Sequence, residues 1–215
     1  MNTSNSKIMK ILVIDDATIN LQAARAQFSE HEVTTANSYD EGREFICKEK
    51  FDVVLTDLLL PGSDYMCRMS NEVGKEMPVG IFLALLAAKH NVPLVGLLTS
   101  NHHTHPGCAC LDHFCSKESR NVSLGFLTVN NSKVFLCNDG NLSTYKFFAD
   151  DLSFPIPFGG ESWSEAVPEK TKALFARKKA EPEAQKVEAK HWSLLLSAMQ
   201  NFSVTAPISV SAKTP

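Results

Sequence analysis

Asp57 is the residue best placed for chemistry, because of where it stands in the chain. It directly follows a short, mostly apolar run, 51–56, and Pro61 and Gly62 then turn the chain. An apolar run of this length, closed by a turn signal, is typical of a strand buried on both faces. Ligands of open α/β sheets bind beyond the carboxyl ends of the strands. Asp57 is therefore a candidate site residue, although a single aspartate at a strand end can also simply cap the next turn.

Other reactive side chains stand in the same kind of position. Each follows or ends its own short, mostly apolar segment: Asp15 and Asp16 after 8–14, Thr99 and Ser100 after 92–98, and Lys117 at the end of 113–117. In a parallel sheet these ends share one edge, so carboxylates, hydroxyls and an ammonium would meet there. Neighbouring carboxylates raise one another's pKa, and a divalent cation such as Mg²⁺ relieves that repulsion. A carboxylate can also attack phosphorus and form an aspartyl phosphate, which a metal, a lysine and a hydroxyl would stabilise.

Strand and helix patterns alternate along the first half of the chain. They predict strands over 7–14, 32–36, 51–56 and 92–98, and helices over 18–31, 39–49 and 79–89. This alternation predicts an α/β fold with a doubly wound parallel sheet and right-handed crossovers. The long apolar stretch 79–98 is interrupted by Lys89, His90, Asn91 and Pro93, whereas a membrane span needs roughly 20 predominantly apolar residues. We therefore expect no membrane association.

These motifs resemble the receiver domain of two-component response regulators. The matching stretches are Lys10 to Asp16 with Asn20 following, Asp57 to Gly62, Leu97 to Ser100, and Phe114 to Lys117. They span about half of the chain, and the first two are specific in combination. The resemblance implies a five-stranded parallel sheet of the flavodoxin-like kind, with strand order 2-1-3-4-5.

The resemblance also implies a role for each matching residue. Asp57 would be the phosphoacceptor, Thr99 the switch hydroxyl, Phe114 the switch aromatic and Lys117 the phosphate-binding lysine. The implied Mg²⁺ ligands are Asp15, Asp16, Asp57 and the backbone carbonyl of Leu59. The phosphoryl group would come from a histidine kinase or a phosphorelay protein, and the output would be a contact with another protein. Such a chain is a signalling switch and not an enzyme.

Three departures from the family pattern favour an alternative. Lys117 is followed by Glu118 where the family normally has proline. The interval from Asp57 to Thr99 is longer than usual, and that from Thr99 to Lys117 is shorter. A degenerate receiver that serves as a protein-binding scaffold would account for these differences. A phosphohydrolase with an aspartyl nucleophile is a weaker alternative. Such enzymes have an Asp-X-Asp motif on the first strand, whereas this chain has Asp15-Asp16-Ala17.

A run rich in histidine and cysteine follows Thr99. Its members are His102, His103, His105, Cys108, Cys110, His113 and Cys115. Imidazole and thiolate groups are good Zn²⁺ ligands, but the spacings match no standard zinc finger or ribbon. Three interpretations remain open: a zinc-binding module, a lining for the site after Thr99, and surface histidines with cysteines that pack as small apolar groups.

The second half of the chain departs from the receiver pattern. We expect a receiver-like domain over 7–120, followed by an insertion over 121–181 that contains a β-hairpin around Asn130, Asn131 and Ser132. An apolar stripe predicts a helix over 182–202 that packs on the receiver sheet, although the stripe could instead form a homodimer seam or dock a partner. The tail 203–215 is expected to be disordered.

The composition narrows the class of protein. The chain has 215 residues, 44% of them hydrophobic, which is enough for a full core. A net charge of −3 and the lack of a basic stripe speak against nucleic acid as a partner. The six cysteines are scattered without the look of a disulfide framework, and the first residues lack a signal-peptide core. A reducing cytoplasm fits these features best.

Overall fold

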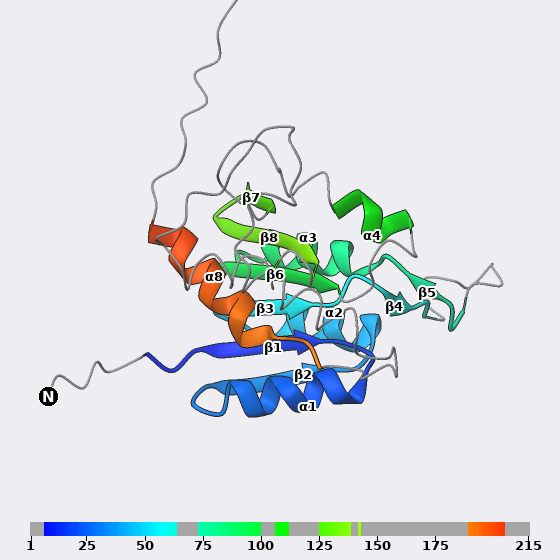
Figure 1. The fold of residues 1–215 in the computed structure, drawn as a ribbon, viewed down its shortest axis with the longest axis horizontal. Helices are drawn as coiled ribbons and strands as arrows, with labels where there is room; N and C mark the ends of the chain where they lie inside the picture. Colours follow the sequence, from blue (N-terminus) through cyan, green and yellow to red (C-terminus); the bar gives the residue numbers. More distant parts are fainter. Residues whose placement is uncertain are drawn as a thin grey trace, which may run out of the picture.

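The computed structural model describes residues 7–63, 73–99, 106–111, 125–138, 142 and 189–204. Its centre is a six-stranded sheet with the order β2-β1-β3-β6-β8-β7 (Figure 1). The strands are β1 (Lys10–Ile14), β2 (Glu32–Ala36), β3 (Val53–Thr56), β6 (Leu94–Thr99), β7 (Gly125–Val129) and β8 (Ser132–Asn138). Every pair is parallel except β7 with β8. The predicted α/β fold with a mostly parallel sheet is therefore confirmed.

Helices cover both faces of this sheet (Figure 1). The helices α1 (Thr18–Gln27) and α8 (Trp192–Val204) lie on one face. The helices α2 (Tyr39–Lys48), α3 (Gly80–Lys89) and α4 (Pro106–Leu111) lie on the other. The strand β3 is buried at every position because both of its faces are covered, which explains its unbroken apolar sequence.

The fifth parallel strand is not where the sequence suggested. The predicted hairpin is present as β7 and β8, joined through Asn130, whose φ of 54° suits the turn. It is not a separate elaboration, because β8 pairs in parallel with β6 over Leu94 to Thr99. The place expected for 113–117 next to β6 is thus taken by β8. Residues 113–117 themselves lie outside the described part of the chain.

The helix α8 completes the layer beside α1, and it starts later than predicted. Residues 189–191 are not helical, and the helix begins at Trp192 rather than near 182. Gly96 of β6 gives the helix room, because a Cβ there would lie 2.8 Å from Leu195 and 2.9 Å from Met199. The apolar stripe of α8 therefore packs on the sheet, against β6.

The chain after Asp57 leaves the sheet and returns to it at the start of α3. Between Asp57 and α3 the chain forms a short antiparallel pair of strands, β4 (Leu60–Pro61) and β5 (Glu76–Met77). Residues 64–72, between these two strands, are outside the described part. The Gly80 N–H then donates to the Leu58 carbonyl at 2.9 Å. A Cβ on Gly80 would stand 1.7 Å from the Asp57 carbonyl oxygen, so only glycine permits this approach.

None of the helices in the described part of the chain is both long enough and apolar enough to cross a membrane. The stretch 79–98, which raised that question, is divided between α3 and β6 as predicted.

We predict that Gly80→Ala destabilises the protein by at least about 2 kcal/mol, because the new methyl group must push the Asp57 peptide or the start of α3 aside. Urea unfolding measures the change. Leu85→Ala is the matched control on the same helix: Leu85 is 43% exposed, and we expect a loss below about 1 kcal/mol. Equal losses for the two variants would contradict this account of Gly80.

Candidate functional site

Three carboxylates meet at the carboxyl edge of the sheet. Asp15 follows β1 and Asp57 follows β3, and the Asp57 N–H donates to the Ile14 carbonyl of the neighbouring strand at 2.8 Å. One ligand atom from each of Asp15, Asp16 and Asp57 lies within 4.8 Å of the others. Asp15 and Asp57 are buried and Asp16 is exposed, so this acidic cluster (Asp15, Asp16 and Asp57) opens to solvent on one side. Among the described residues, these three side chains form the group that could hold a metal ion.

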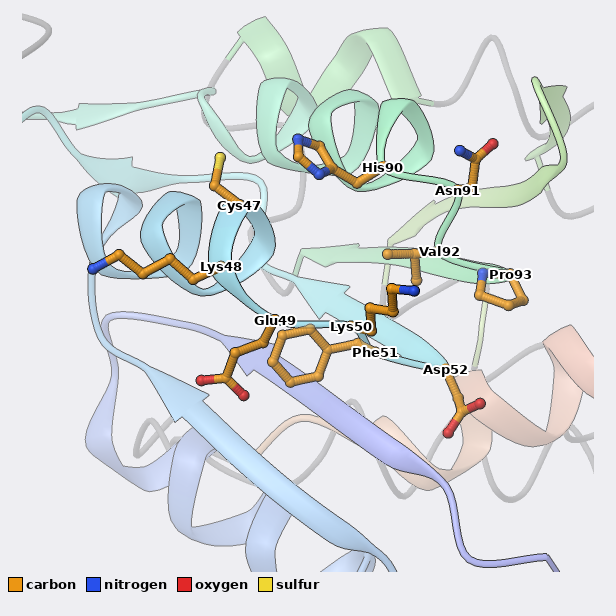
Figure 2. Close-up of a pocket in the computed structure, with 10 residues that line it drawn as sticks. All are labelled: Cys47, Lys48, Glu49, Lys50, Phe51, Asp52, His90, Asn91, Val92 and Pro93. Carbon is orange, nitrogen blue, oxygen red and sulfur yellow. The ribbon is translucent and has the colours of Figure 1, made fainter.

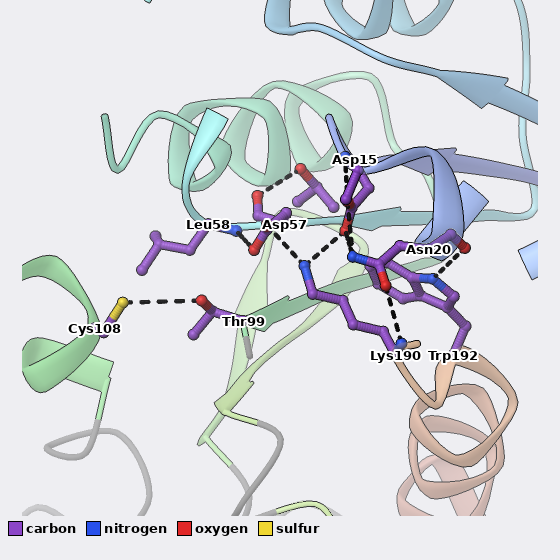
Figure 3. Close-up of polar contacts among 10 residues, drawn as sticks. Asp15, Asn20, Asp57, Leu58, Thr99, Cys108, Lys190 and Trp192 are labelled. Atoms are coloured by element: carbon purple, nitrogen blue, oxygen red, sulfur yellow. Dashed lines mark hydrogen bonds and ion pairs between the residues drawn. The ribbon is translucent and has the colours of Figure 1, made fainter. Parts of the chain in front are cut away.

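A buried lysine, Lys190, joins two of these carboxylates (Figure 3). Its Nζ lies 2.6 Å from Asp15 Oδ2 and 2.7 Å from Asp57 Oδ2, and the residue is only 1% exposed. Lys190 precedes α8, which starts at the carboxyl edge and runs back along the sheet. The lysine therefore reaches the acidic cluster from the segment before the last helix.

Lys190 was not predicted from the sequence. The family resemblance instead implied Lys117, which lies outside the described residues, as do Phe114 and residues 100–105. One signal was available in the sequence. Because a helix that follows a parallel strand begins near the carboxyl edge, any lysine immediately before the last amphipathic helix is a candidate for the site.

The cluster carries more negative charge than its lysine can neutralise. Three carboxylates and one ammonium leave two negative charges when all of these groups are ionised. The pKa of Asp57 is raised to about 6, chiefly by burial and also by the neighbouring Asp15, although Lys190 acts in the opposite direction. Burial and the neighbouring Asp15 also raise the pKa of Asp16. A group of oxygens with an excess of two negative charges suits a divalent cation.

Short-range hydrogen bonds hold the backbone and the carboxylate of Asp57 in place. Its Oδ1 accepts the Leu58 N–H at 2.6 Å, and the Thr56 hydroxyl donates to the Asp57 carbonyl at 2.9 Å. One oxygen is thereby directed to the backbone and the other to Lys190. Leu59 lies two residues further on with its side chain buried. The role of its carbonyl as a metal ligand stays a prediction.

Thr99 lies at the end of β6, where the sequence predicted it, and is buried. Its Oγ1 lies 3.8 Å from Cys108 Sγ of α4, a hydrogen-bonding distance for sulfur (Figure 3). Burial raises the pKa of the Cys108 thiol, so this thiol stays protonated near neutral pH. Thr99 thus faces α4, on the side of the cluster away from Lys190.

The described part of the histidine- and cysteine-rich run consists of residues 106–111. Cys108 is buried and Cys110 is exposed, and both are free thiols. Residues two apart on a helix do not face each other, so these two sulfurs point in different directions. The remaining members of the run lie outside the described residues. Cys108 and Cys110 therefore do not form a pair of zinc ligands, and they do not support the zinc interpretation.

A pocket of about 730 Å³ lies at the opposite edge of the sheet (Figure 2). It is lined by residues before β3 and β6 and at the ends of α2 and α3, among them Cys47, Phe51, Asp52, His90 and Pro93. These residues stand at the amino ends of the strands, whereas the acidic cluster stands at the carboxyl ends. The pocket is therefore not part of the site around Asp57.

We predict that Asp57→Asn stabilises the metal-free protein at about pH 7.5 by about 1–3 kcal/mol. The folded-state pKa of Asp57, about 6, is above its usual 3.8, so the neutral carboxyl stabilises the fold fully below pH 3.8 and this contribution is lost as the pH rises through about 6. Urea unfolding in a chelator at about pH 4 and pH 7.5 should show the gain only at the higher pH. A variant less stable than wild type at pH 7.5 would mean that the Lys190 ion pair outweighs the cost of burial.

No family model and no curated protein matches this chain. Solved structures to which it is similar include response regulator receiver domains. A CheY-like receiver domain protein from Methanospirillum hungatei JF-1 is 24% identical, with 46% of this chain and 69% of that chain covered and a TM-score of 0.34. The receiver domain of the Francisella response regulator 1452 is 26% identical, with 45% and 69% covered and a TM-score of 0.33. The chemotaxis response regulator CheY4 of Vibrio cholerae is 22% identical, with 46% and 73% covered and a TM-score of 0.34.

Proposed function

We propose that this chain is a response-regulator receiver in which Asp57 accepts a phosphoryl group in the presence of Mg²⁺. The observation that carries the proposal is the meeting of three carboxylates and a buried lysine at the carboxyl edge of a doubly wound sheet. A nucleophilic carboxylate, a cation-binding group and a fixed ammonium are the parts that phosphoryl transfer to an aspartate needs.

The acidic cluster would hold the cation through oxygens of Asp15, Asp16, Asp57 and the Leu59 carbonyl. Mg²⁺ prefers a few protein oxygens together with waters and phosphate oxygens, and the exposed side of the cluster at Asp16 leaves room for them. When bound, the cation neutralises charge on the phosphoryl oxygens. The excess of two negative charges in the cluster is the chain's own contribution to that binding.

Asp57 would supply the nucleophile. One carboxylate oxygen forms the new bond to phosphorus while the bond between phosphorus and the donor breaks, and the electron pair leaves with the donor group. Leu58 N–H holds the other oxygen, so the carboxylate is oriented before the reaction. We assign the phosphate-binding role to Lys190 rather than to Lys117, because its ammonium lies 2.7 Å from Asp57.

Phosphorylation would act as a switch through Thr99, with Phe114 as the aromatic partner that the family resemblance implies. The Thr99 hydroxyl would exchange Cys108 for a phosphoryl oxygen, which frees α4 to shift. The donor would be a histidine kinase or a phosphorelay protein, and the output would be a contact with another protein. A cytoplasmic location is part of this proposal, as is a role as a signalling protein without turnover of its own.

One observation favours the alternative of a degenerate receiver that acts as a binding scaffold. Lys190 already contacts both buried carboxylates, so the ion pairs close the inner side of the cluster without any cation. If these ion pairs are the final state of the site, Asp57 only pairs with Lys190 and never reacts.

Phosphorylation by a small donor separates the two functions. We predict that wild-type protein incubated with acetyl phosphate and Mg²⁺ gains the mass of one labile phosphoryl group, measured by intact mass spectrometry. Asp57→Asn, and wild type in a chelator, should gain nothing. The absence of any gain in wild type, with correct folding shown by circular dichroism, would favour the scaffold.

A second prediction decides which lysine serves Asp57. We expect Lys190→Met to slow phosphorylation by acetyl phosphate at least tenfold, because no ammonium then neutralises the phosphoryl oxygens. Mg²⁺ affinity should not fall, since the variant removes a cation that competes for Asp15 and Asp57. Lys117→Met should react within about twofold of wild type. A slow Lys117→Met and a normal Lys190→Met would reverse the assignment.

A further inference from the structure

Asn20 connects the acidic cluster to the start of α8 through four hydrogen bonds (Figure 3). Its Nδ2 donates to Asp15 Oδ1 at 2.9 Å and to Asp15 Oδ2 at 3.1 Å. Its side-chain Oδ1 accepts the Lys190 backbone N–H at 3.1 Å, and its backbone carbonyl accepts the Trp192 indole N–H at 3.1 Å. The residue is 7% exposed, so water does not readily replace these partners.

The side chain at this position has to donate and accept at once. An asparagine amide offers two N–H donors to the carboxylate and a carbonyl to the backbone N–H. An aspartate would lose the donors and repel Asp15, and an apolar residue would leave buried polar groups without a partner, which is costly. The neighbours on either side also fix the orientation of the amide, because its nitrogen has to face the carboxylate.

We propose that Asn20 is a positioning residue that orients Asp15 for a divalent cation and couples the occupancy of the acidic cluster to the docking of α8. This proposal rests on the cation site of the proposed function. The Lys190 ammonium pairs with Asp15 and also lies 5.3 Å from the centre of the Trp192 ring. A cation that takes an Asp15 oxygen weakens the Lys190 pair, and the ammonium shifts relative to that ring. Asn20 holds Asp15, Lys190 and Trp192 in one network, so the change reaches the first turn of α8.

Gln27 provides a matched control on the same helix. Its Nε2 donates to the Lys190 carbonyl at 2.9 Å, and its Oε1 accepts the Ser193 N–H at 2.8 Å. It therefore also links α1 to the start of α8, by two hydrogen bonds, but these bonds do not involve Asp15. Gln27→Ala loosens the docking of α8 without changing what holds the carboxylate.

The test compares Mg²⁺ binding by Asn20→Ala and Gln27→Ala, measured by titration calorimetry on the full chain. We expect Asn20→Ala to bind Mg²⁺ at least tenfold more weakly than wild type, a usual loss for a group that orients a metal ligand. Because a loosened α8 does not oppose the cation, Gln27→Ala should bind Mg²⁺ no more weakly than wild type, although both variants should melt at a lower temperature. Equal affinities for the two variants would overturn the positioning role. Asn20→Ser replaces Asn20→Ala if the latter does not fold.

Tryptophan fluorescence tests the coupling separately. The chain has two tryptophans, so Trp163→Phe leaves Trp192 as the single reporter. In that background Mg²⁺ should change the Trp192 emission at the concentrations that fill the site, and Asn20→Ala should shift the change to higher concentrations. Calorimetric Mg²⁺ binding without any change in emission would overturn the coupling. Mg²⁺ binding without phosphorylation would contradict the proposed function alone, whereas no Mg²⁺ binding by wild type would overturn both.

Discussion

The structure depends on how one buried ammonium is shared between two buried carboxylates. Lys190 is held by Asp15 and Asp57, and none of the three would be stable at this depth by itself, because an unpaired charge away from water is expensive. The pairing joins parts of the chain that are 175 residues apart, the end of β1 and the start of α8. With Asp16 included, the carboxylates still exceed the lysine in number. This excess of negative charge destabilises the fold, and it also makes the site suitable for a divalent cation.

This interaction explains the architecture around it. The parallel strands β1, β3, β6 and β8 bring Asp15, Asp57, Thr99 and Asn138 to one edge. The strand β8 ends at this edge in Asn138. The lysine that contacts the carboxylates is Lys190, which lies just before α8. The α8 helix can take this position because Gly96 lets it lie close to β6 and because Asn20 and Gln27 of α1 hold its first residues. Lys190 can therefore reach the acidic cluster even though a long segment separates it from β8.

The sequence allowed the first half of the fold and the carboxylates to be predicted because their signals are local. Each of Asp15, Asp57 and Thr99 directly follows its own apolar run, and strand–helix alternation places such positions at one edge. Lys190 could not be found in this way. Its position depends on which segment forms the fifth strand, and a short run such as 113–117 cannot be distinguished from β8 by periodicity. The importance of Gly80 and the hydrogen bonds of Asn20 were likewise not predicted, since the first depends on a close backbone approach and the second on a network across three elements.

A crystal structure of the protein with Mn²⁺, an anomalously scattering substitute for Mg²⁺, tests directly whether the acidic cluster holds a divalent cation. We expect one strong anomalous peak at bonding distance from oxygens of Asp15, Asp16 and Asp57, with the Lys190 ammonium beside Asp57 and its contact with Asp15 lengthened. An acidic cluster without Mn²⁺ at millimolar concentration, with Lys190 still paired to both carboxylates, would contradict this expectation.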